Sequence, residues 1–215
     1  MSPPGSPSRA TGMAGSIVAA LLALGVAGCV TLLPKAPPVQ LYRFAWHEPA
    51  AVPATAPATG AASTTIAALI TSFQPAAAND RLLSVTGSEA ADIAGARWVS
   101  PAVSLFQTAL DQALDGRGGR LSRVSHGEPA TADLRLSIEV ERFEVEYDQG
   151  AGAAPAVRIE AHAALDRPGT PAARRERGFA VVVRASDNRV AAIVHAYDEA
   201  VSQTLDQLVV WAGTS

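Results

Sequence analysis

The sequence predicts an α+β fold, a two-layer sandwich in which two amphipathic helices cover a mostly antiparallel sheet. Apolar residues recur at three- and four-residue spacing in residues 101–115 and 190–211, which is the helical period. Apolar and polar residues alternate in 134–147, 157–165 and 175–184, which is the strand period. With 48% hydrophobic residues but 5% aromatic ones, the core is expected to consist mostly of Ala, Val and Leu.

The start of the chain is typical of a secretory signal peptide. A polar segment with Arg9 precedes an apolar run at 17–26, about half as long as the roughly 20 residues that a membrane-spanning helix needs. The small residues Ala27 and Gly28 then follow, as they do at a cleavage site. The run therefore predicts a signal peptide, residues 1–28, rather than a permanent span.

Cys29 is the one cysteine of the chain, so it cannot form an intrachain disulfide. The stretch Val26-Ala27-Gly28-Cys29 resembles a bacterial lipobox, where signal peptidase II cuts before a diacylated cysteine; the alternative is an ordinary buried cysteine after an apolar helix. The lipobox predicts cleavage between Gly28 and Cys29, diacylglycerol and an N-acyl lipid on Cys29, a tether at 29–38 and a domain at 39–215. Val30, in place of Asp, favours sorting to the outer membrane of a Gram-negative bacterium.

The first predicted element of the domain is a strand at 39–46. Its aromatic residues alternate with polar or small ones and would share one face: Tyr42, Phe44 and Trp46. Residues 48–65 are rich in Ala, Pro and Thr and predict a mobile loop. Short strands are then expected at 66–73 and 81–86, separated by Pro75 and Asn79-Asp80.

A helix is expected from Pro101, because Pro is favoured at the first helical position and Ser100 can cap it. Its apolar stripe consists of Val103, Phe106, Leu110, Ala113 and Leu114. Glycines from Gly116 onward end it. A short strand near Leu121 is expected next. The last helix, 190–211, is expected to be capped by Asp187 or Asn188.

The strand at 134–147 changes phase. Leu134, Leu136, Ile138 and Val140 share one face, and the alternation then continues in Phe143, Val145 and Tyr147. This shift predicts a β-bulge near Glu141-Arg142. The other face is acidic, with Glu139, Glu141, Glu144, Glu146 and Asp148. Arginines of the next two strands are expected to pair with these acids: Arg158, Arg177 and Arg184.

Composition and motifs argue against several functions. The net charge is −3, and the one basic cluster, 174–177, is too small for a nucleic-acid footprint. Lys35 is the one lysine, and the chain lacks a Walker A loop, a Gly-x-Ser-x-Gly elbow and a Ser-x-x-Lys motif. Its histidines are too scattered for a metal motif: His47, His126, His162 and His195. No enzymatic activity, metal or cofactor is predicted.

The stretch ARWVSPAVSLFQTALDQAL, with the lipobox, the LYRF strand and the C-terminal helix, resembles the ABC-type transport auxiliary lipoproteins. Its motif residues are Arg97, Trp98 and Pro101, with Trp98 expected to anchor the helix to the sheet; the long Ala/Pro/Thr insert departs from the pattern. The resemblance implies a non-enzymatic outer-membrane lipoprotein on the periplasmic face. Its implied partners are an MCE-domain lipid carrier, an inner-membrane ABC permease and ATPase, membrane lipid, and further copies of itself in a ring.

Two other functions stay open. One is an accessory lipoprotein for lipopolysaccharide or barrel assembly in the outer membrane. The other is a periplasmic hydrolase that uses the acidic strand, which predicts a pocket with a convergent acid pair and a raised carboxyl pKa. Ring contacts, if present, are expected at exposed edge strands or where 174–177 meets a neighbour's acidic strand. Trp211 is expected either to pack in the core or to form an exposed contact.

Overall fold

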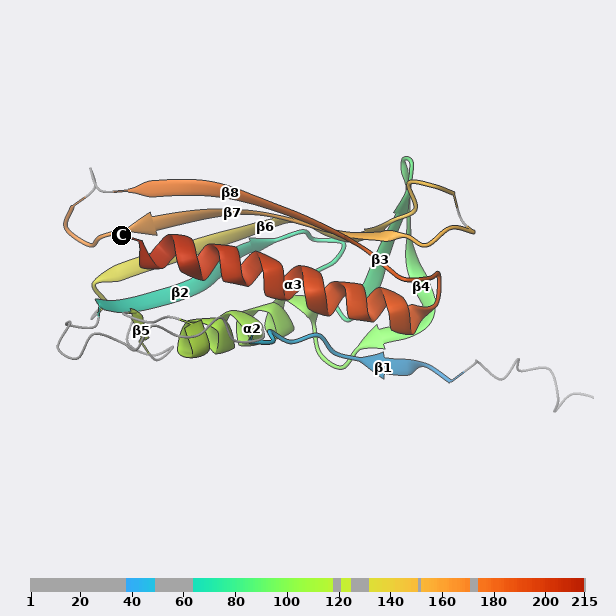
Figure 1. The fold of residues 1–215 in the computed structure, drawn as a ribbon, viewed down its shortest axis with the longest axis horizontal. Helices are drawn as coiled ribbons and strands as arrows, with labels where there is room; N and C mark the ends of the chain where they lie inside the picture. Colours follow the sequence, from blue (N-terminus) through green and yellow to red (C-terminus); the bar gives the residue numbers. More distant parts are fainter. Residues whose placement is uncertain are drawn as a thin grey trace, which may run out of the picture. The chain divides into compact units, whose positions relative to one another are not determined.

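A mixed sheet and two helices form the structure, a computed structural model that describes residues 38–48, 64–117, 121–124, 132–150, 152–170 and 174–214. Residues Val39–Ser215 make one compact unit. Helices α2 (Ala102–Arg117) and α3 (Val190–Gly213) lie against one face of the sheet, with α3 running lengthwise across it (Figure 1). The predicted α+β class is therefore confirmed. Among the described helices, none is long and apolar enough to cross a membrane.

Strand β6 (Leu134–Glu146) organises the sheet. Along one edge it pairs antiparallel with β7 (Ala156–Asp166), from Arg135 to Glu146. Its other edge is shared by β2 (Thr64–Phe73) and β3 (Arg81–Thr86), which are both parallel to it. Gln74 fills the gap between these two partners: its Oε1 accepts from the Phe143 backbone N–H at 2.7 Å, and its Nε2 donates to Glu144 at 2.7 Å.

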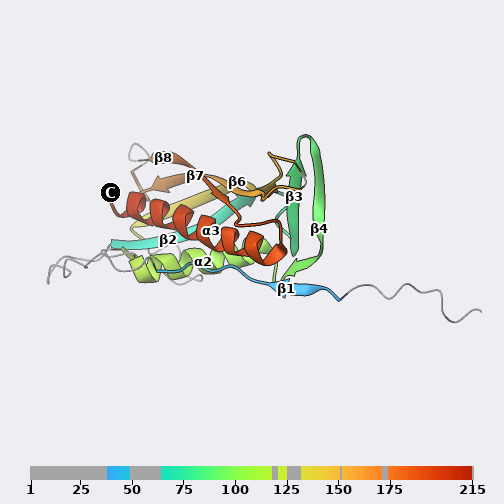
Figure 2. The same cartoon turned by 45° about the vertical axis from the view of Figure 1, so that its right-hand side comes forward.

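The remaining strands extend the sheet to its edges. β8 (Arg175–Arg184) pairs antiparallel with β7, and β4 (Glu89–Trp98) pairs antiparallel with β3. β1 (Gln40–Tyr42) and β5 (Leu121–Arg123) lie parallel to β4 and β2. The longest ladders are thus antiparallel, as predicted, whereas four pairings are parallel: β1–β4, β2–β5, β2–β6 and β3–β6. Figure 2 shows the β3–β4 hairpin projecting beyond the helices.

The predicted bulge is confirmed. The β6–β7 register shifts between Val140 and Arg142, at the place where the sequence changes phase. Because the extra residue resets the alternation, Phe143 and Val145 face the core although they lie an odd number of residues from Leu134. Without it, the second half of β6 would turn its apolar side chains to solvent.

An aromatic cluster joins the sheet to α3. Trp98 is 2% exposed and its ring meets that of Phe44 at 5.0 Å and that of Tyr197 at 5.1 Å, both nearly perpendicular. The ring centroids of Phe143 and Tyr197 are 4.9 Å apart. Trp98 is therefore a core residue, as expected, and its ring contacts Tyr197 of α3. Trp211 is also in the core, against Phe179 at 5.8 Å.

The first strand is shorter than predicted. β1 ends at Tyr42, and residues 43–48 continue as extended chain without a strand partner. Phe44 still points into the core, as its alternation with polar residues implied. The loop expected at 48–65 lies mostly outside the described residues, and its last two residues, Thr64 and Thr65, already belong to β2.

The structure also differs from the expectations in one additional strand and in the cap of α3. Strand β4 was not predicted, because its sequence is rich in Ala and Gly and it is exposed on both faces over most of its length. The N-cap of α3 is Arg189, whose side chain makes no capping bond. Asp187 instead accepts the Arg189 backbone N–H at 2.7 Å, and Asn188 accepts a hydrogen bond from the Tyr147 hydroxyl at 2.9 Å.

Candidate functional site

The predicted lipidation site is not among the described residues. Gly28 and Cys29 both precede residue 38, where the described part of the chain begins. Cleavage and acylation at this position therefore stay predictions.

The motif residues Arg97, Trp98 and Pro101 build the corner between β4 and α2. Arg97 Nη1 lies 3.1 Å from the Asp80 carboxylate, and the Trp98 backbone N–H donates to the Asp80 carbonyl at 2.7 Å. The Pro101 carbonyl accepts from Leu105 in the first turn of α2 at 3.1 Å. This corner fixes the direction in which the helix leaves the sheet. The described contacts of the motif residues therefore have a structural role.

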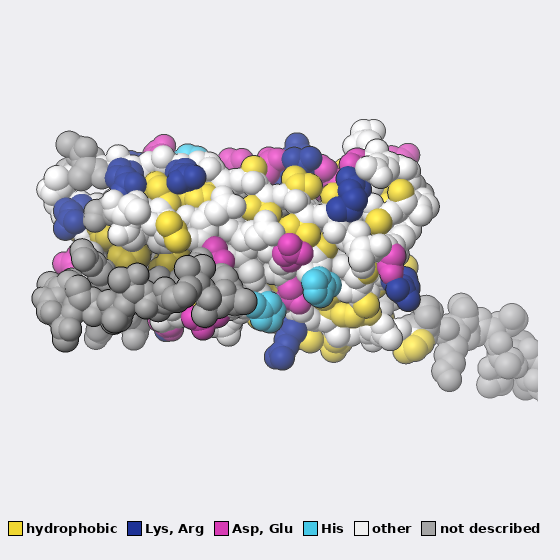
Figure 3. Space-filling view, in the orientation of Figure 1, with side chains coloured by type: hydrophobic (Ala, Val, Ile, Leu, Met, Phe, Trp, Pro, Cys, Tyr) yellow, Lys and Arg dark blue, Asp and Glu magenta, His cyan; other side chains and the backbone are white. Residues whose placement is uncertain are grey.

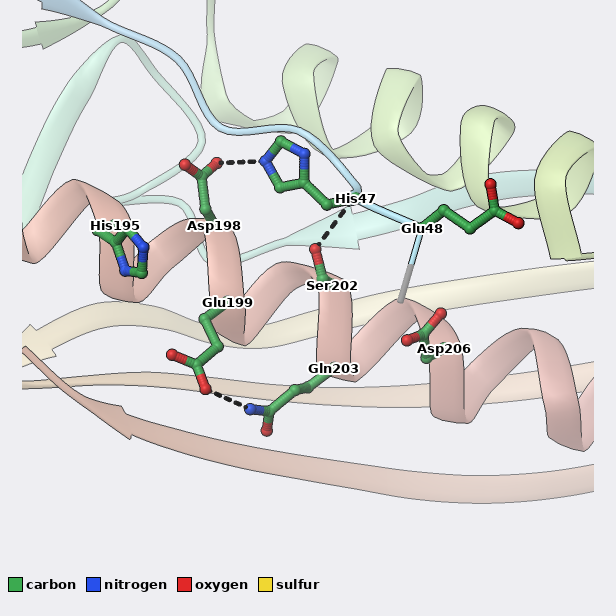
Figure 4. Close-up of a pocket in the computed structure, with 8 residues that line it drawn as sticks. All are labelled: His47, Glu48, His195, Asp198, Glu199, Ser202, Gln203 and Asp206. Carbon is green, nitrogen blue, oxygen red and sulfur yellow. Dashed lines mark hydrogen bonds and ion pairs between the residues drawn. The ribbon is translucent and has the colours of Figure 1, made fainter. Parts of the chain in front are cut away.

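A groove along α3 gathers residues that are far apart in the sequence. His47 and Glu48 form one wall and α3 forms the other, around a volume of about 420 Å³. Figure 4 shows the lining side chains, and Figure 3 shows two histidines with acidic side chains between them on this face of the molecule. The lining residues are His47, Glu48, His195, Asp198, Glu199, Ser202, Gln203 and Asp206.

Helix α3 holds residues 45–47 through one acceptor in each turn. Asp198 Oδ1 accepts from the Ala45 backbone N–H at 3.1 Å, and Ser202 Oγ accepts from that of His47 at 3.1 Å. Asp206 Oδ1 accepts from the Trp46 indole at 3.0 Å. These acceptors are four residues apart and lie on one helix face. They take the place of a neighbouring strand, which explains how an extended segment persists outside the sheet.

The groove is polar but has no arrangement typical of catalysis. His47 Nε2 lies 3.7 Å from Asp198 Oδ1, yet the imidazole is 66% exposed and the same carboxylate oxygen already holds Ala45. Among the described residues, no group of three or more His, Cys, Asp or Glu side chains could hold a metal ion. This groove was not predicted from the sequence, because nothing in the spacing of Asp198, Ser202 and Asp206 shows which hydrogen bonds they accept.

The acidic strand is a salt-bridged surface. Arg158 Nε lies 2.8 Å from Glu146 and its Nη1 lies 3.2 Å from Glu160, while Arg142 contacts Glu146 at 3.3 Å and Glu160 at 3.4 Å. Glu146 of β6 and Glu160 of β7 thus each meet two guanidinium groups. Arg177 departs from the expected pairing. Its guanidinium instead lies 5.2 Å from the ring centroid of Phe179.

At the end of this surface, the Arg184 guanidinium holds the pKa of Asp148 below its ordinary value by hydrogen bonding. A catalytic acid needs the opposite shift. The hydrolase alternative required a carboxyl with a raised pKa, and Asp148 has the opposite shift.

The class defined by these features is a small α+β domain with a mixed sheet covered on one face by two helices. The chain belongs to the ABC-type transport auxiliary lipoprotein component family, whose sequence model matches residues 48–209. The suspected family is thereby confirmed. The match includes the β4–α2 corner but begins after β1, so it does not reach Cys29.

Solved structures show the same fold. The crystal structure of protein XCC0632 from Xanthomonas campestris, of family DUF330, has a TM-score of 0.64 and 23% identity, covering 82% of this chain and 95% of that one. The crystal structure of an uncharacterized protein has a TM-score of 0.63 and 14% identity, covering 81% and 99%. At these identities the likeness concerns the fold alone. No curated protein sequence matches the chain.

Proposed function

We propose that this protein is an outer-membrane lipoprotein facing the periplasm, the auxiliary component of an MCE/ABC-type intermembrane lipid transport system. Its role in this proposal is to dock the MCE-domain protein and so to help lipid pass to or from the outer membrane. The match to the ABC-type transport auxiliary lipoprotein component family over residues 48–209 carries the proposal.

The sequence before the domain supports the anchor. Val26-Ala27-Gly28-Cys29 has the small residues and the acyl acceptor of a lipobox, and Val30 in place of Asp favours the outer membrane. The signal peptide would be 1–28, the tether 29–38 and the folded domain 39–215. A cysteine carrying several acyl chains gives durable attachment, since each buried methylene contributes about 0.8 kcal/mol.

A non-enzymatic role fits the described side chains. Glu144 and Glu146 of β6 are paired with arginines, and Asp198 and Asp206 hold residues 45–47 in place. The surface of the sheet that the described helices leave uncovered carries the Arg142, Arg158, Glu146 and Glu160 network, which is suited to a charged protein partner. This supports docking as the function.

A ring of copies is also part of the proposal. Within the described sheet, β1, β5 and β8 each pair with one neighbour, so each leaves an edge where another chain can add. The cluster at 174–177 is less suited to this contact than the sequence suggested. Arg174 already pairs with Asp166 at 3.1 Å and with Glu176 at 2.6 Å in its own chain, and the Arg175 guanidinium lies 5.3 Å from the Trp211 ring centroid.

The test is affinity purification from fractionated membranes with the partners read by mass spectrometry. Wild type is expected in the outer membrane with acylated Cys29 and an MCE-domain protein. Cys29→Ala should remain an uncleaved or mislocalised precursor. Val30→Asp is the matched control, because it keeps the acyl acceptor but is expected to hold the protein in the inner membrane.

Each alternative gives a different result. Recovery of lipopolysaccharide- or barrel-assembly proteins without an MCE protein would favour the assembly accessory. An unacylated Cys29 would refute the anchor. If wild type recovers the MCE protein and both variants recover less of it, the result supports the proposed location as well as the proposed partner.

A further inference from the structure

Strand β1 presents an apolar row to solvent. Val39 is 49% exposed and Leu41 is 63% exposed, and Arg43 follows at the next outward position. Their neighbours Tyr42 and Phe44 point toward the core instead. Large aliphatic side chains at this exposure, followed by a cation in the same row, form an amphipathic edge rather than an ordinary solvated strand.

Val99, the residue directly after the neighbouring strand β4, extends this row. In the parallel pairing of β1 with β4, Leu41 is opposite Arg97 and Tyr42 is opposite Trp98. The Val99 backbone N–H donates to the Tyr42 carbonyl at 2.8 Å, which places Val99 just beyond this pair. Val99 is 53% exposed, so the β1 patch consists of Val39, Leu41 and Val99, with Arg43 at its border.

Arg43 is the cation at the border of the patch, and the other arginines near it are paired with acids. Arg97 is paired with Asp80 and Arg81 with Asp92, at 3.1 Å and 2.7 Å. Among the described side chains, none forms an ion pair with Arg43. A guanidinium group beside exposed aliphatic side chains matches the boundary of a phospholipid layer, where phosphate lies next to the first methylenes.

Other exposed aliphatic side chains do not form such a group. Leu69, Val182 and Val210 are each about half exposed, but they lie on β2, β8 and α3. Single exposed aliphatic side chains are normal on a protein surface. The β1 patch differs because its members lie in or directly beside the paired strands β1 and β4, at one edge of the sheet (Figures 1 and 2).

The patch also stands where the domain begins. Val39 is ten residues after Cys29, and a fully extended chain of that length spans about 35 Å at most. An acylated Cys29 would therefore keep β1 close to a bilayer at all times. Three aliphatic side chains are too few to bind a membrane alone, but an anchor raises the local concentration enough for weak contacts to count.

We propose that the β1 patch is a membrane-contact surface: Val39, Leu41 and Val99 enter the boundary between headgroups and acyl chains, and Arg43 binds lipid phosphate. The inference rests on the proposed acylation of Cys29. Contact at β1 gives the domain a fixed side toward the lipid and leaves the α3 groove and the salt-bridged surface available to protein partners. An acyl anchor at a single residue does not by itself define such an orientation.

The test uses the full mature lipoprotein in vesicles of phosphatidylethanolamine and phosphatidylglycerol that contain a doxyl-labelled acyl chain. Acylation occupies the sulfur of Cys29, the one native cysteine, so Leu41→Cys supplies a single thiol for a fluorescent label. Val182→Cys is the matched control on β8. We expect the label at 41 to be quenched roughly twofold or more relative to the label at 182. Arg43→Gln, with the label kept at 41, should reduce that quenching.

Flotation with the same vesicles reports the anchor separately. A protein that floats, with equal quenching at 41 and 182, overturns the membrane-contact surface while leaving the anchor intact. A protein that does not float overturns the anchor and this inference together. A change in the label at 41 that needs an added MCE-domain protein, with no quenching by lipid alone, assigns the patch to a protein partner and also overturns the inference.

Discussion

Trp46 and Asp206 are 160 residues apart, and their side chains are joined by a hydrogen bond of 3.0 Å from the indole N–H to Oδ1. The same indole lies against Gly116 near the end of α2, where a Cβ would be 2.7 Å from the ring atoms Cη2 and Cζ3. One side chain of the non-strand segment 43–48 thus contacts both helices. The segment before the Ala/Pro/Thr insert is therefore part of the folded domain.

The Trp46–Asp206 bond is expected to contribute about 1 kcal/mol to the free energy of unfolding, as a bond to a charged, partly exposed group does. Trp46→Phe removes the donor, and Asp206→Asn weakens the acceptor. A double-mutant cycle in urea separates their coupling from the change in ring size. Gln203→Ala, on the same helix, is the control and should change stability by less than about 0.5 kcal/mol. Additive effects of the two substitutions would contradict the prediction.

Gly116→Ala is expected to destabilise the protein by about 1–3 kcal/mol, because the new methyl group overlaps the Trp46 ring. Replacing Gly by Ala in a helix normally gains up to about 1 kcal/mol, so the expected sign is opposite to the propensity. Gly213→Ala is the matched control at the end of α3, where the nearest atom would be Leu121 Cδ1 at 3.9 Å. Thermal unfolding of both variants decides the matter: equal midpoints would refute the close contact.

Tyr197→Phe is expected to leave the free energy of unfolding unchanged or to raise it by up to about 1 kcal/mol. The hydroxyl oxygen is buried without a hydrogen-bond partner among the described atoms, and burial raises the pKa of this tyrosine far above its ordinary value. Tyr147→Phe is the comparison, since its hydroxyl donates to Asn188 at 2.9 Å; it should lose about 0.5–1 kcal/mol. Urea unfolding of the two variants measures both changes, and a larger loss in Tyr197→Phe would show that its hydroxyl has a partner.

The sequence was most informative where burial follows a strict period. The phase shift after Val140 predicted the bulge, because a strand with one buried face cannot otherwise keep its apolar residues inside. The stripe of α3 was predicted for the same reason, as Ile193, Tyr197 and Leu205 show. Both elements bury one face over many residues, so the pattern is repeated often enough to be unambiguous.

The sequence was least informative where the partner of a segment is remote. Alternation at Tyr42, Phe44 and Trp46 fits a strand equally well as an extended segment on a helix, and the choice depends on Asp198 and Asp206 in α3. No local signal connects these positions. Strand β4 has little alternation to detect, since most of it projects from the domain and buries little. The groove along α3 was not predicted because its two walls are remote from each other in the sequence.

Stability at acid pH is expected to depend on the bidentate pair of Asp148 and Arg184. Arg184 Nη1 and Nη2 donate to the two carboxylate oxygens at 3.0 and 2.6 Å, and this lowers the pKa of Asp148 from its ordinary value of 3.8. The folded state therefore binds this proton less readily than the unfolded state does. The stabilisation is complete above the ordinary pKa and is lost as the pH falls through the lower folded value.

Arg184→Gln removes the pair, so the free energy of unfolding should fall less steeply than in wild type over roughly pH 5 to 2. Arg43→Gln removes the same charge from an arginine that has no ion pair with a described side chain, and it should keep the wild-type slope. Denaturant unfolding over a pH series gives both slopes. High salt should also flatten the wild-type curve, because the pair is exposed and therefore screened. If the two variants have the same slope, the carboxylate of Asp148 is not the group whose protonation weakens the fold.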